Sequence, residues 1–105
     1  MPRSTLLALF TALLLTSCAT HRLEKYGAHY RQHQDRESLQ KVVDLLPIGA
    51  DTARVKQLLG EPIDFGFDYR YLVNATGSNG CPVGAVFHIG ELGKIDQQWL
   101  GEICE

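Results

Sequence analysis

Hydrophobic residues at helical spacing mark the first element that the chain predicts. After position 38, leucines and valines recur every three or four residues, as they do on the buried side of an amphipathic helix. These residues are Leu39, Val42, Val43 and Leu46. Asp35 or Ser38 is placed to cap the start of the helix, and Pro47 ends it, because a residue before proline disfavours helical conformation. The pattern therefore predicts a helix over residues 38–46.

A second and shorter helix is predicted over residues 51–59. Its hydrophobic side is formed by Val55, Leu58 and Leu59. Asp51 is placed to cap the first turn through a carboxylate bond to free backbone N–H groups. Gly60 suits the position that follows a helix, and Pro62 prevents its continuation. Because about two turns do not persist alone in water, packing must hold this helix on a flat surface.

Aromatic residues then alternate with polar ones, which predicts a half-buried strand over residues 64–73. The alternating set is Phe65, Phe67, Tyr69, Tyr71 and Val73. We expect this row to lie beneath the two helices, because aromatic side chains in a strand contribute large apolar areas to a core. Asp64 and Asp68 share the opposite face of the strand, where we expect them to be solvated.

Two further strands complete the predicted sheet. The second covers residues 81–89 and the third starts at Ile95, with connections over residues 74–80 and 90–93. The residues expected on a shared face are Val83, Ala85, Phe87 and Ile89, followed by Ile95, Gln97 and Trp99. His88 is expected to face solvent. The predicted fold class is α+β, with two short helices packed on a three-stranded antiparallel sheet (ααβββ).

The chain begins with the pattern of a bacterial lipoprotein signal. Arg3 gives a basic start, residues 6–15 form an apolar run, and two small residues precede Cys18. The apolar run is too short to span a bilayer but has the length of a signal's hydrophobic region. The sequence therefore predicts a signal peptide over residues 1–17 that is cleaved before Cys18.

Cys18 is the predicted lipidation site. Its sulfur would carry an S-diacylglycerol group and its amino group an N-acyl chain. Each buried methylene contributes roughly 0.8 kcal/mol, so the lipid of the outer membrane would hold the protein firmly. Ala19 follows Cys18, whereas aspartate at this position retains lipoproteins in the inner membrane of Gram-negative cells. The predicted location is the outer membrane, lipid-anchored, on its periplasmic face.

Residues 18–36 are predicted to form the lipidated N-terminus and a tether, and residues 37–105 the folded domain. The segment is polar and mixed in charge, as a spacer from the bilayer would be. We favour an extension that is partly helical over a wholly irregular tether. Four of its residues follow a helical spacing, namely Leu23, Tyr26, Tyr30 and His33. Gly27 counts against the helix by roughly 1 kcal/mol.

Composition and motifs argue against several functions. The chain of 105 residues has room for one domain, and its 10 basic and 12 acidic residues give no basic excess that would favour nucleic acid. It has neither a nucleophile elbow nor a phosphate-binding loop. His29 and His33 are spaced as a helical metal pair, but no further ligand is placed to complete a site. We therefore predict a protein that is not an enzyme and has no catalytic residues, metal or cofactor.

Two cysteines remain after the anchor is assigned. In an exported protein, Cys81 and Cys104 are expected to form a disulfide, with a reduced metal-binding pair as the alternative. A two-residue turn at residues 92–93 places these cysteines opposite each other. Matching the apolar faces instead pairs Ile89 with Ile95, one residue out of that register. A bulge, or departure of Cys104 from the strand end, would reconcile the two.

The order of these elements and one stretch resemble a known family. Residues 48–62 (IGADTARVKQLLGEP) are similar to the first helix-turn motif of the BamE-like (SmpA/OmlA) family of small outer-membrane lipoproteins. Residues 69–71 (YRY) and 86–89 (VFHI) resemble later strands of that family. The similarity covers roughly residues 36–100. The cysteine pair and the glycine-rich loop over residues 77–80 depart from the pattern of its best-known member.

The resemblance implies a function and a class of partner. The best-known member is an accessory lipoprotein of the machinery that folds outer-membrane β-barrels. We therefore expect a non-enzymatic accessory in outer-membrane assembly or envelope maintenance, with an envelope protein partner such as an outer-membrane assembly component. The alternative is a periplasmic protein-binding or inhibitor module that its lipid holds at the membrane. Because a fold does not determine a function, no partner-binding residues are transferred.

Overall fold

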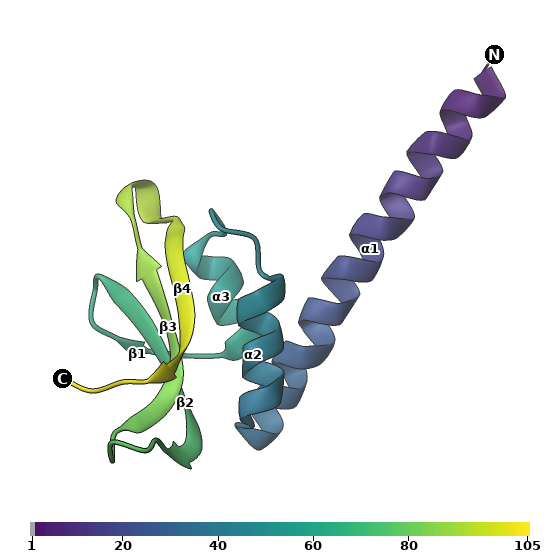
Figure 1. Ribbon diagram of the computed structural model, residues 1–105. Helices are drawn as coiled ribbons and strands as arrows, with labels where there is room; N and C mark the ends of the chain where they lie inside the picture. The colour runs from purple at the N-terminus through teal and green to yellow at the C-terminus, as the bar shows by residue number, and fades with distance from the viewer. Residues whose placement is uncertain (1) are drawn as a thin grey trace.

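Three α-helices precede a four-stranded antiparallel sheet in the described part of the chain (Figure 1). The computed structural model describes the backbone of residues 2–105 and the side chains of residues 18–105. The helices are α1 (Pro2–His33), α2 (Arg36–Leu45) and α3 (Thr52–Leu59). The strands are β1 (Ile63–Asp64), β2 (Asp68–Thr76), β3 (Pro82–Ile89) and β4 (Ile95–Glu102), with a 3₁₀ turn at Glu91–Gly93. The α+β class is confirmed, but α1 and β1 are additional to the two helices and three strands that we predicted.

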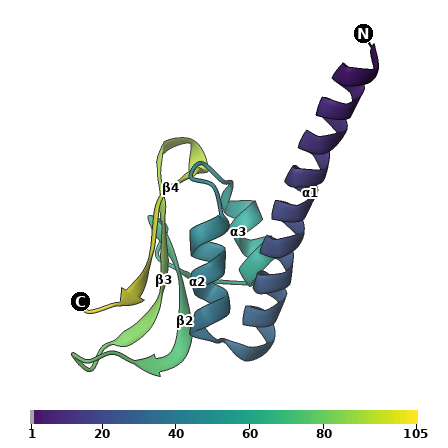
Figure 2. The same ribbon diagram turned by 45° about the vertical axis from the view of Figure 1, so that its right-hand side comes forward.

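The strands pair in chain order, and the helices lie on one side of the sheet. The order is β1-β2-β3-β4, so each hairpin connects neighbours. Figures 1 and 2 show α2 and α3 on the same side of the sheet, with α1 beyond α2. This leaves the other face of the sheet uncovered by helices. We call it the outer face.

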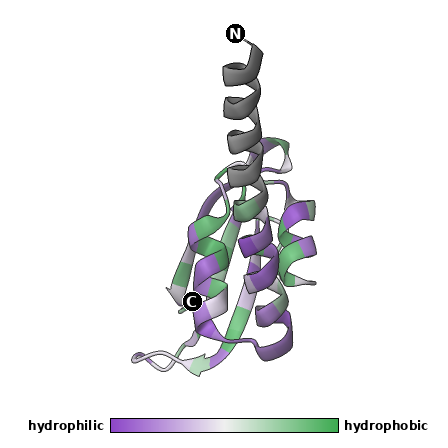
Figure 3. Ribbon diagram, turned by 90° about the vertical axis from the view of Figure 1, so that its right-hand side faces the viewer, coloured by the Kyte–Doolittle hydropathy of each residue, from purple (hydrophilic) through white to green (hydrophobic). Residues whose placement is uncertain are grey.

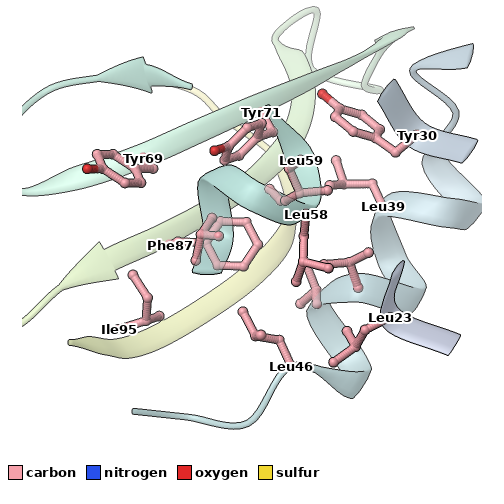
Figure 4. Packing of buried hydrophobic residues seen from close by; sticks show 14 of the residues in the cluster. Leu23, Tyr30, Leu39, Leu46, Leu58, Leu59, Tyr69, Tyr71, Phe87 and Ile95 are labelled. Carbon is pink, nitrogen blue, oxygen red and sulfur yellow. The ribbon is translucent and has the colours of Figure 1, made fainter. Parts of the chain in front are cut away.

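The core lies between the sheet and the helices. Figure 4 shows residues of α1, α2 and α3 meeting residues of β2, β3 and β4 in this layer. Its most deeply buried side chains are Leu39, Val42, Val55, Leu58, Phe87 and Ile95. Fully burying a side chain of this kind contributes roughly 1.5–3 kcal/mol. The hydrophobic stripes that predicted α2 and α3 are therefore the residues that fill the core.

The segment that we predicted as a partly helical tether is helical, as expected, and packs against the rest of the fold. Residues 18–33 belong to α1, and the side chains of Leu23 and Tyr30 are only 6% and 4% exposed. Both lie in the same hydrophobic cluster as the residues of α2 and α3. The folded domain therefore begins before residue 37, because this part of α1 buries its hydrophobic residues against the other helices.

The aromatic row is interrupted by a turn. Phe65 and Phe67 are 49% and 56% exposed, whereas Tyr69, Tyr71 and Val73 are buried as predicted. The Gly66 N–H donates a hydrogen bond to Asp64 Oδ1 over 2.8 Å, and Gly66 has a φ of +85°, which favours glycine. The predicted strand thus divides into β1 and β2, which form a hairpin of their own.

A bulge in β4 reconciles the two registers between β3 and β4. Ile89 pairs with Ile95, while His88 pairs with Gln97, so Asp96 is the extra residue. The bulge changes which residues share a face. Ile95 points into the core, but Trp99 pairs with Val86 and is exposed on the outer face. The prediction that Ile95 and Trp99 share a face was wrong for this reason.

The capping interactions differ between α2 and α3. Asp35 is the N-cap of α2 and accepts a hydrogen bond from the Ser38 N–H over 2.9 Å. Asp51 holds the N-cap position of α3 but makes no side-chain cap bond, because its carboxylate pairs with Lys94 of the β3–β4 connection. Figure 3 looks onto the helices and shows hydrophilic and hydrophobic residues alternating along them, as amphipathic helices require.

The predicted signal peptide falls largely on residues that are not described in full. Residue 1 and the side chains of residues 2–17 lie outside the described ones, and these include the hydrophobic run and the small residues before Cys18. Among the residues that are described, no helix is both long enough and apolar enough to cross a membrane.

Candidate functional site

Cys18 is an exposed, unpaired cysteine on α1. Leu23, the first core residue among the described side chains of the helix, follows five positions later, which corresponds to a rise of about 7.5 Å along the axis. Cleavage before Cys18 would leave this cysteine as the first residue of the part of α1 that packs on the domain. A lipid on its sulfur would therefore be joined to the folded domain by a short helical segment.

Close contact between α1 and α3 fixes the direction of this segment. A Cβ atom on Gly27 would lie 2.5 Å from the carbonyl oxygen of Leu58, so the helices can approach this closely only at a glycine. Arg31, one turn later, donates to the carbonyl oxygens of Gln57 and Leu58 over 3.1 and 2.5 Å. These carbonyls lie at the C-terminus of α3, where a cation is favourable. The glycine that counted against a helix in the sequence is what lets α1 dock.

Tyr30 joins α1 to the sheet. Its hydroxyl donates to the carbonyl oxygen of Leu72 in β2 over 2.6 Å, and its ring meets the Tyr71 ring edge-on with centroids 6.2 Å apart. Burial raises the pKa of Tyr30 to about 12. This value favours the protonated hydroxyl that makes the bond. Helix α1 is thus held through Gly27 and Arg31, which contact α3, and through Tyr30, which contacts β2.

Cys81 and Cys104 form a disulfide, as the sequence predicted. Their Cα atoms lie 5.3 Å apart, just before the start of β3 and just after the end of β4. The bulge near Ile95 keeps the rest of the two strands in the register that brings the cysteines together. The bond closes the open end of the β3–β4 hairpin.

Glu102 organises the loop beside this disulfide. Its carboxylate accepts hydrogen bonds from the N–H groups of Asn79 and Cys81 over 2.8 and 3.0 Å, and from the Asn79 side chain over 2.9 Å. Because Gly77 has no Cβ atom, the Glu102 carboxylate can occupy the space that this atom would fill. Cys81, Glu102 and Cys104 lie close enough together to resemble a metal site. With both sulfurs in a disulfide, however, neither cysteine supplies the thiolate that binds metal.

His29 lies beside Ser38 and Asp35, a grouping that the sequence analysis missed. His29 Nδ1 lies 2.7 Å from Ser38 Oγ and 2.9 Å from Asp35 Oδ1. In a nucleophilic triad the serine and the carboxylate contact different ring nitrogens, whereas here both contact the same one. The grouping instead caps α2. His33, the other residue of the predicted histidine pair, packs its ring against that of His29 with centroids 4.3 Å apart.

The charge of Asp35 is stabilised by this cap. Burial raises its pKa, but hydrogen bonds from the Ser38 side chain, the Ser38 N–H and His29 outweigh that effect and lower the pKa to about 2. An ionised carboxylate at the N-terminus of α2 is also favoured by the helix dipole. Asp35 therefore fixes the turn between α1 and α2.

Arg70 is the centre of a charged and aromatic cluster on the outer face. Its guanidinium lies 4.4 Å from the ring centroid of Phe65 and donates to the Asp68 carboxylate over 3.2 and 3.3 Å. It also pairs with Glu105 at the end of the chain. The hydrogen bonds that Arg70 donates to Glu105 and then to Asp68 raise the pKa of Arg70. Asp64 is exposed, as expected, and accepts the turn hydrogen bond, whereas Asp68, also expected to be solvated, is buried in this ion pair.

A shallow apolar hollow of about 240 Å³ adjoins Arg70. It is lined by Ile63, Phe65, Arg70, Leu72, Pro82, Ile103 and Glu105. Trp99, 45% exposed, lies on the same face of the sheet. The outer face therefore offers aromatic and apolar side chains beside a fixed cation. Asp64 and Gly66, typical turn residues, were the signals that could have revealed its exposed phenylalanines.

Comparisons of the chain with protein-family models, with curated proteins and with solved structures found no match. Function must therefore be argued from two features of the chain itself. One is the exposed cysteine at the end of the packed part of α1. The other is the outer face of the sheet, which the helices leave uncovered.

Proposed function

We propose that this protein is an outer-membrane lipoprotein, anchored through an acylated Cys18, that acts as a non-enzymatic accessory in outer-membrane assembly or envelope maintenance. The observation that carries the proposal is the state of the three cysteines. Cys81 and Cys104 are joined, while Cys18 is unpaired, exposed and preceded by the apolar run and two small residues of a lipoprotein signal pattern. An unpaired thiol at this position is what lipid attachment requires.

The contacts of the polar side chains support a binding role rather than a catalytic one. His29 caps a helix with Asp35, and Arg70 is paired with two carboxylates. Glu102 is committed to backbone groups of the loop before β3. These groups stabilise the fold, and a reaction would require them to leave their partners.

The outer face supports the proposal that this lipoprotein binds another protein. Exposed aromatic residues and arginine are enriched where proteins meet, and here Phe65, Arg70 and Trp99 share one face. The β1–β2 hairpin presents Phe65 and Phe67 with ring centroids 6.1 Å apart. An envelope protein partner would cover this surface.

Lipid attachment can be tested by metabolic labelling with palmitate in a Gram-negative host. The protein should take up label and fractionate with the outer membrane. The Cys18→Ala variant should do neither. The double variant Cys81→Ser and Cys104→Ser is the matched control, because it removes two other sulfurs and should still be labelled. Labelling of the Cys18→Ala variant, or an unlabelled wild-type protein, would contradict the proposal.

The partner can be identified by placing a photo-cross-linking amino acid at Phe65 or Trp99 in cells. Adducts with components of the β-barrel assembly machinery would support the accessory role. A single periplasmic enzyme in the adducts would instead support the second candidate, an inhibitor module held at the membrane. The hollow beside Arg70 favours this candidate, because it could receive an apolar side chain of a target. Equal cross-linking from Ser78, on the β2–β3 loop, would show that the outer face is not selective.

A further inference from the structure

Two large hydrophobic side chains are exposed at one end of the domain. Leu92 is 94% exposed at the tip of the β3–β4 connection, and Ile48 is 61% exposed in the α2–α3 connection. Figures 1 and 2 both show these two connections side by side at the same end of the molecule. Neither side chain contributes to the core. Their exposure therefore has no explanation in the stability of the domain.

The backbone at Leu92 makes its exposure more notable. Leu92 has a φ of +69° and a ψ of 10°, a left-handed conformation that costs a residue with a Cβ atom roughly 1–2 kcal/mol. Glycine or asparagine would adopt it more readily. A leucine that is strained and almost fully exposed gains nothing from contacts within the domain. A contact outside the domain would account for it.

The two connections form one platform. The Gly49 N–H donates to the carbonyl oxygen of Ile95 over 2.7 Å, and the Ile95 N–H donates to that of Ala50 over 2.8 Å. The ion pair between Asp51 and Lys94 adds a further link between them. Ile48 and Leu92 are therefore held on backbone that the sheet and α3 position together.

This platform lies at the same end of the domain as Cys18. Ala19 and Thr20 line a hollow of about 540 Å³ together with the α2–α3 connection, including Ile48 and Gly49. The β2–β3 loop is at the opposite end of the sheet (Figure 1). Since Leu23 is already in the core, a lipid on Cys18 would draw this end of the domain against the membrane surface.

We propose that Ile48 and Leu92 insert into the interfacial region of the lipid bilayer and fix the orientation of the domain on it. The proposal rests on lipid attachment at Cys18. Around the platform Lys94 pairs with Asp51 and Arg54 lies near Glu24, which leaves Glu91 as an exposed acidic residue without an ion pair among the described side chains and gives no basic excess. Contact is therefore apolar and does not depend on anionic lipid. Anchor and platform together would hold the sheet at a set angle, with its outer face open to a partner.

Depth-dependent fluorescence quenching tests this contact on the full, lipidated protein. Trp99 is the chain's one tryptophan, so a Trp99→Phe background allows a single reporter at each position. The reporters are Leu92→Trp, Ile48→Trp and, as the matched control at the far end of the sheet, Ser78→Trp. Each protein is reconstituted into phosphatidylcholine vesicles whose acyl chains are brominated near the headgroups.

Reporters at positions 92 and 48 should be quenched roughly twofold or more above the reporter at position 78, because interfacial side chains lie ~5–10 Å into the headgroup boundary. Quenching should persist at high salt. The mass of each protein is measured first. A protein without lipid on Cys18 would contradict the proposed function, whereas a lipidated protein quenched equally at all three positions would overturn the membrane contact alone.

A Leu92→Asn variant separates the contact from folding. Asparagine tolerates the positive φ of this position, so the variant should fold at least as stably as the wild type. A tryptophan reporter at position 48 in this variant should nevertheless lose most of its quenching. Unchanged quenching in this variant would show that Leu92 has no part in the contact.

Discussion

The hydroxyl of Tyr30 donates a hydrogen bond to the carbonyl oxygen of Leu72 over 2.6 Å, linking α1 to β2 across the domain. This bond, with the close approach at Gly27, makes the segment after Cys18 part of the folded unit. The anchor proposed at Cys18 would consequently position the domain as well as retain it.

Loss of the Tyr30 hydroxyl should destabilise the domain. We expect Tyr30→Phe to lower the free energy of unfolding by about 1–2 kcal/mol, because the carbonyl of Leu72 loses a buried donor. Urea denaturation measures this loss of unfolding free energy, and the m-value should stay unchanged. Tyr69→Phe is the control, since the Tyr69 hydroxyl makes no hydrogen bond to the residues with described side chains. Equal losses in the two variants would show that the bond to Leu72 is not special.

Substitution of Gly27 tests the contact between α1 and α3, because the contact determines whether stability falls or rises. On helix propensity alone, Gly27→Ala should stabilise α1 by roughly 1 kcal/mol. The new Cβ atom would instead meet the carbonyl of Leu58, so we expect a net loss of about 1–3 kcal/mol. Thermal unfolding measures the change. A rise in Tm would mean that α1 does not pack closely on α3.

Asp35 should make stability depend on acid pH. The pKa of Asp35 in the folded protein, about 2, is below its ordinary value of 3.8. Its contribution to stability is therefore complete above about pH 4 and is lost as the pH falls through about 2. Asp35→Asn can still cap α2 but carries no charge, so its stability should vary less over this range. Urea midpoints between these pH values provide the measurement, and parallel curves for the two proteins would contradict the prediction.

Removal of the disulfide should weaken the domain without affecting the anchor. The bond joins cysteines 23 positions apart. Closing a loop of that length contributes on the order of 3 kcal/mol. We expect the Cys81→Ser and Cys104→Ser double variant to unfold at correspondingly lower urea. Cys18→Ser, which removes a thiol outside the disulfide, should unfold at the same urea concentration as the unlipidated wild-type domain. Labelling of free thiols on Cys81 and Cys104 in protein from the periplasm would show that the bond does not form.

The parts of the fold that local patterns determine could be predicted from the sequence. The stripe that includes Leu39 and Val42 defined α2, and the competing registers at Ile89 and Cys81 indicated the bulge. A conflict between two strong constraints was informative here, because it required either an extra residue or departure of Cys104 from the strand end. The disulfide was expected for a different reason, because two cysteines remain in an exported protein once Cys18 is assigned.

The missed features depend on contacts between distant segments. Gly27 looked like a helix breaker because its neighbour, the Leu58 carbonyl, is not visible in the local sequence. The alternation of aromatic and polar residues continues through the turn at Phe65 and Phe67. A period of two therefore does not distinguish one long strand from a hairpin centred on Gly66. The outer face and the platform at Leu92 appear only when the layers of the fold are known.

The central claim is that Cys18 carries the lipid, and the intact mass of protein extracted from outer membranes tests it most directly. We predict a chain that begins at residue 18 and carries a diacylglyceryl group and an acyl chain on the N-terminal peptide. The Cys18→Ala variant should retain residues 1–17 and carry no lipid. A wild-type mass that corresponds to the unmodified chain, or to a chain with a free Cys18 thiol, would contradict the account.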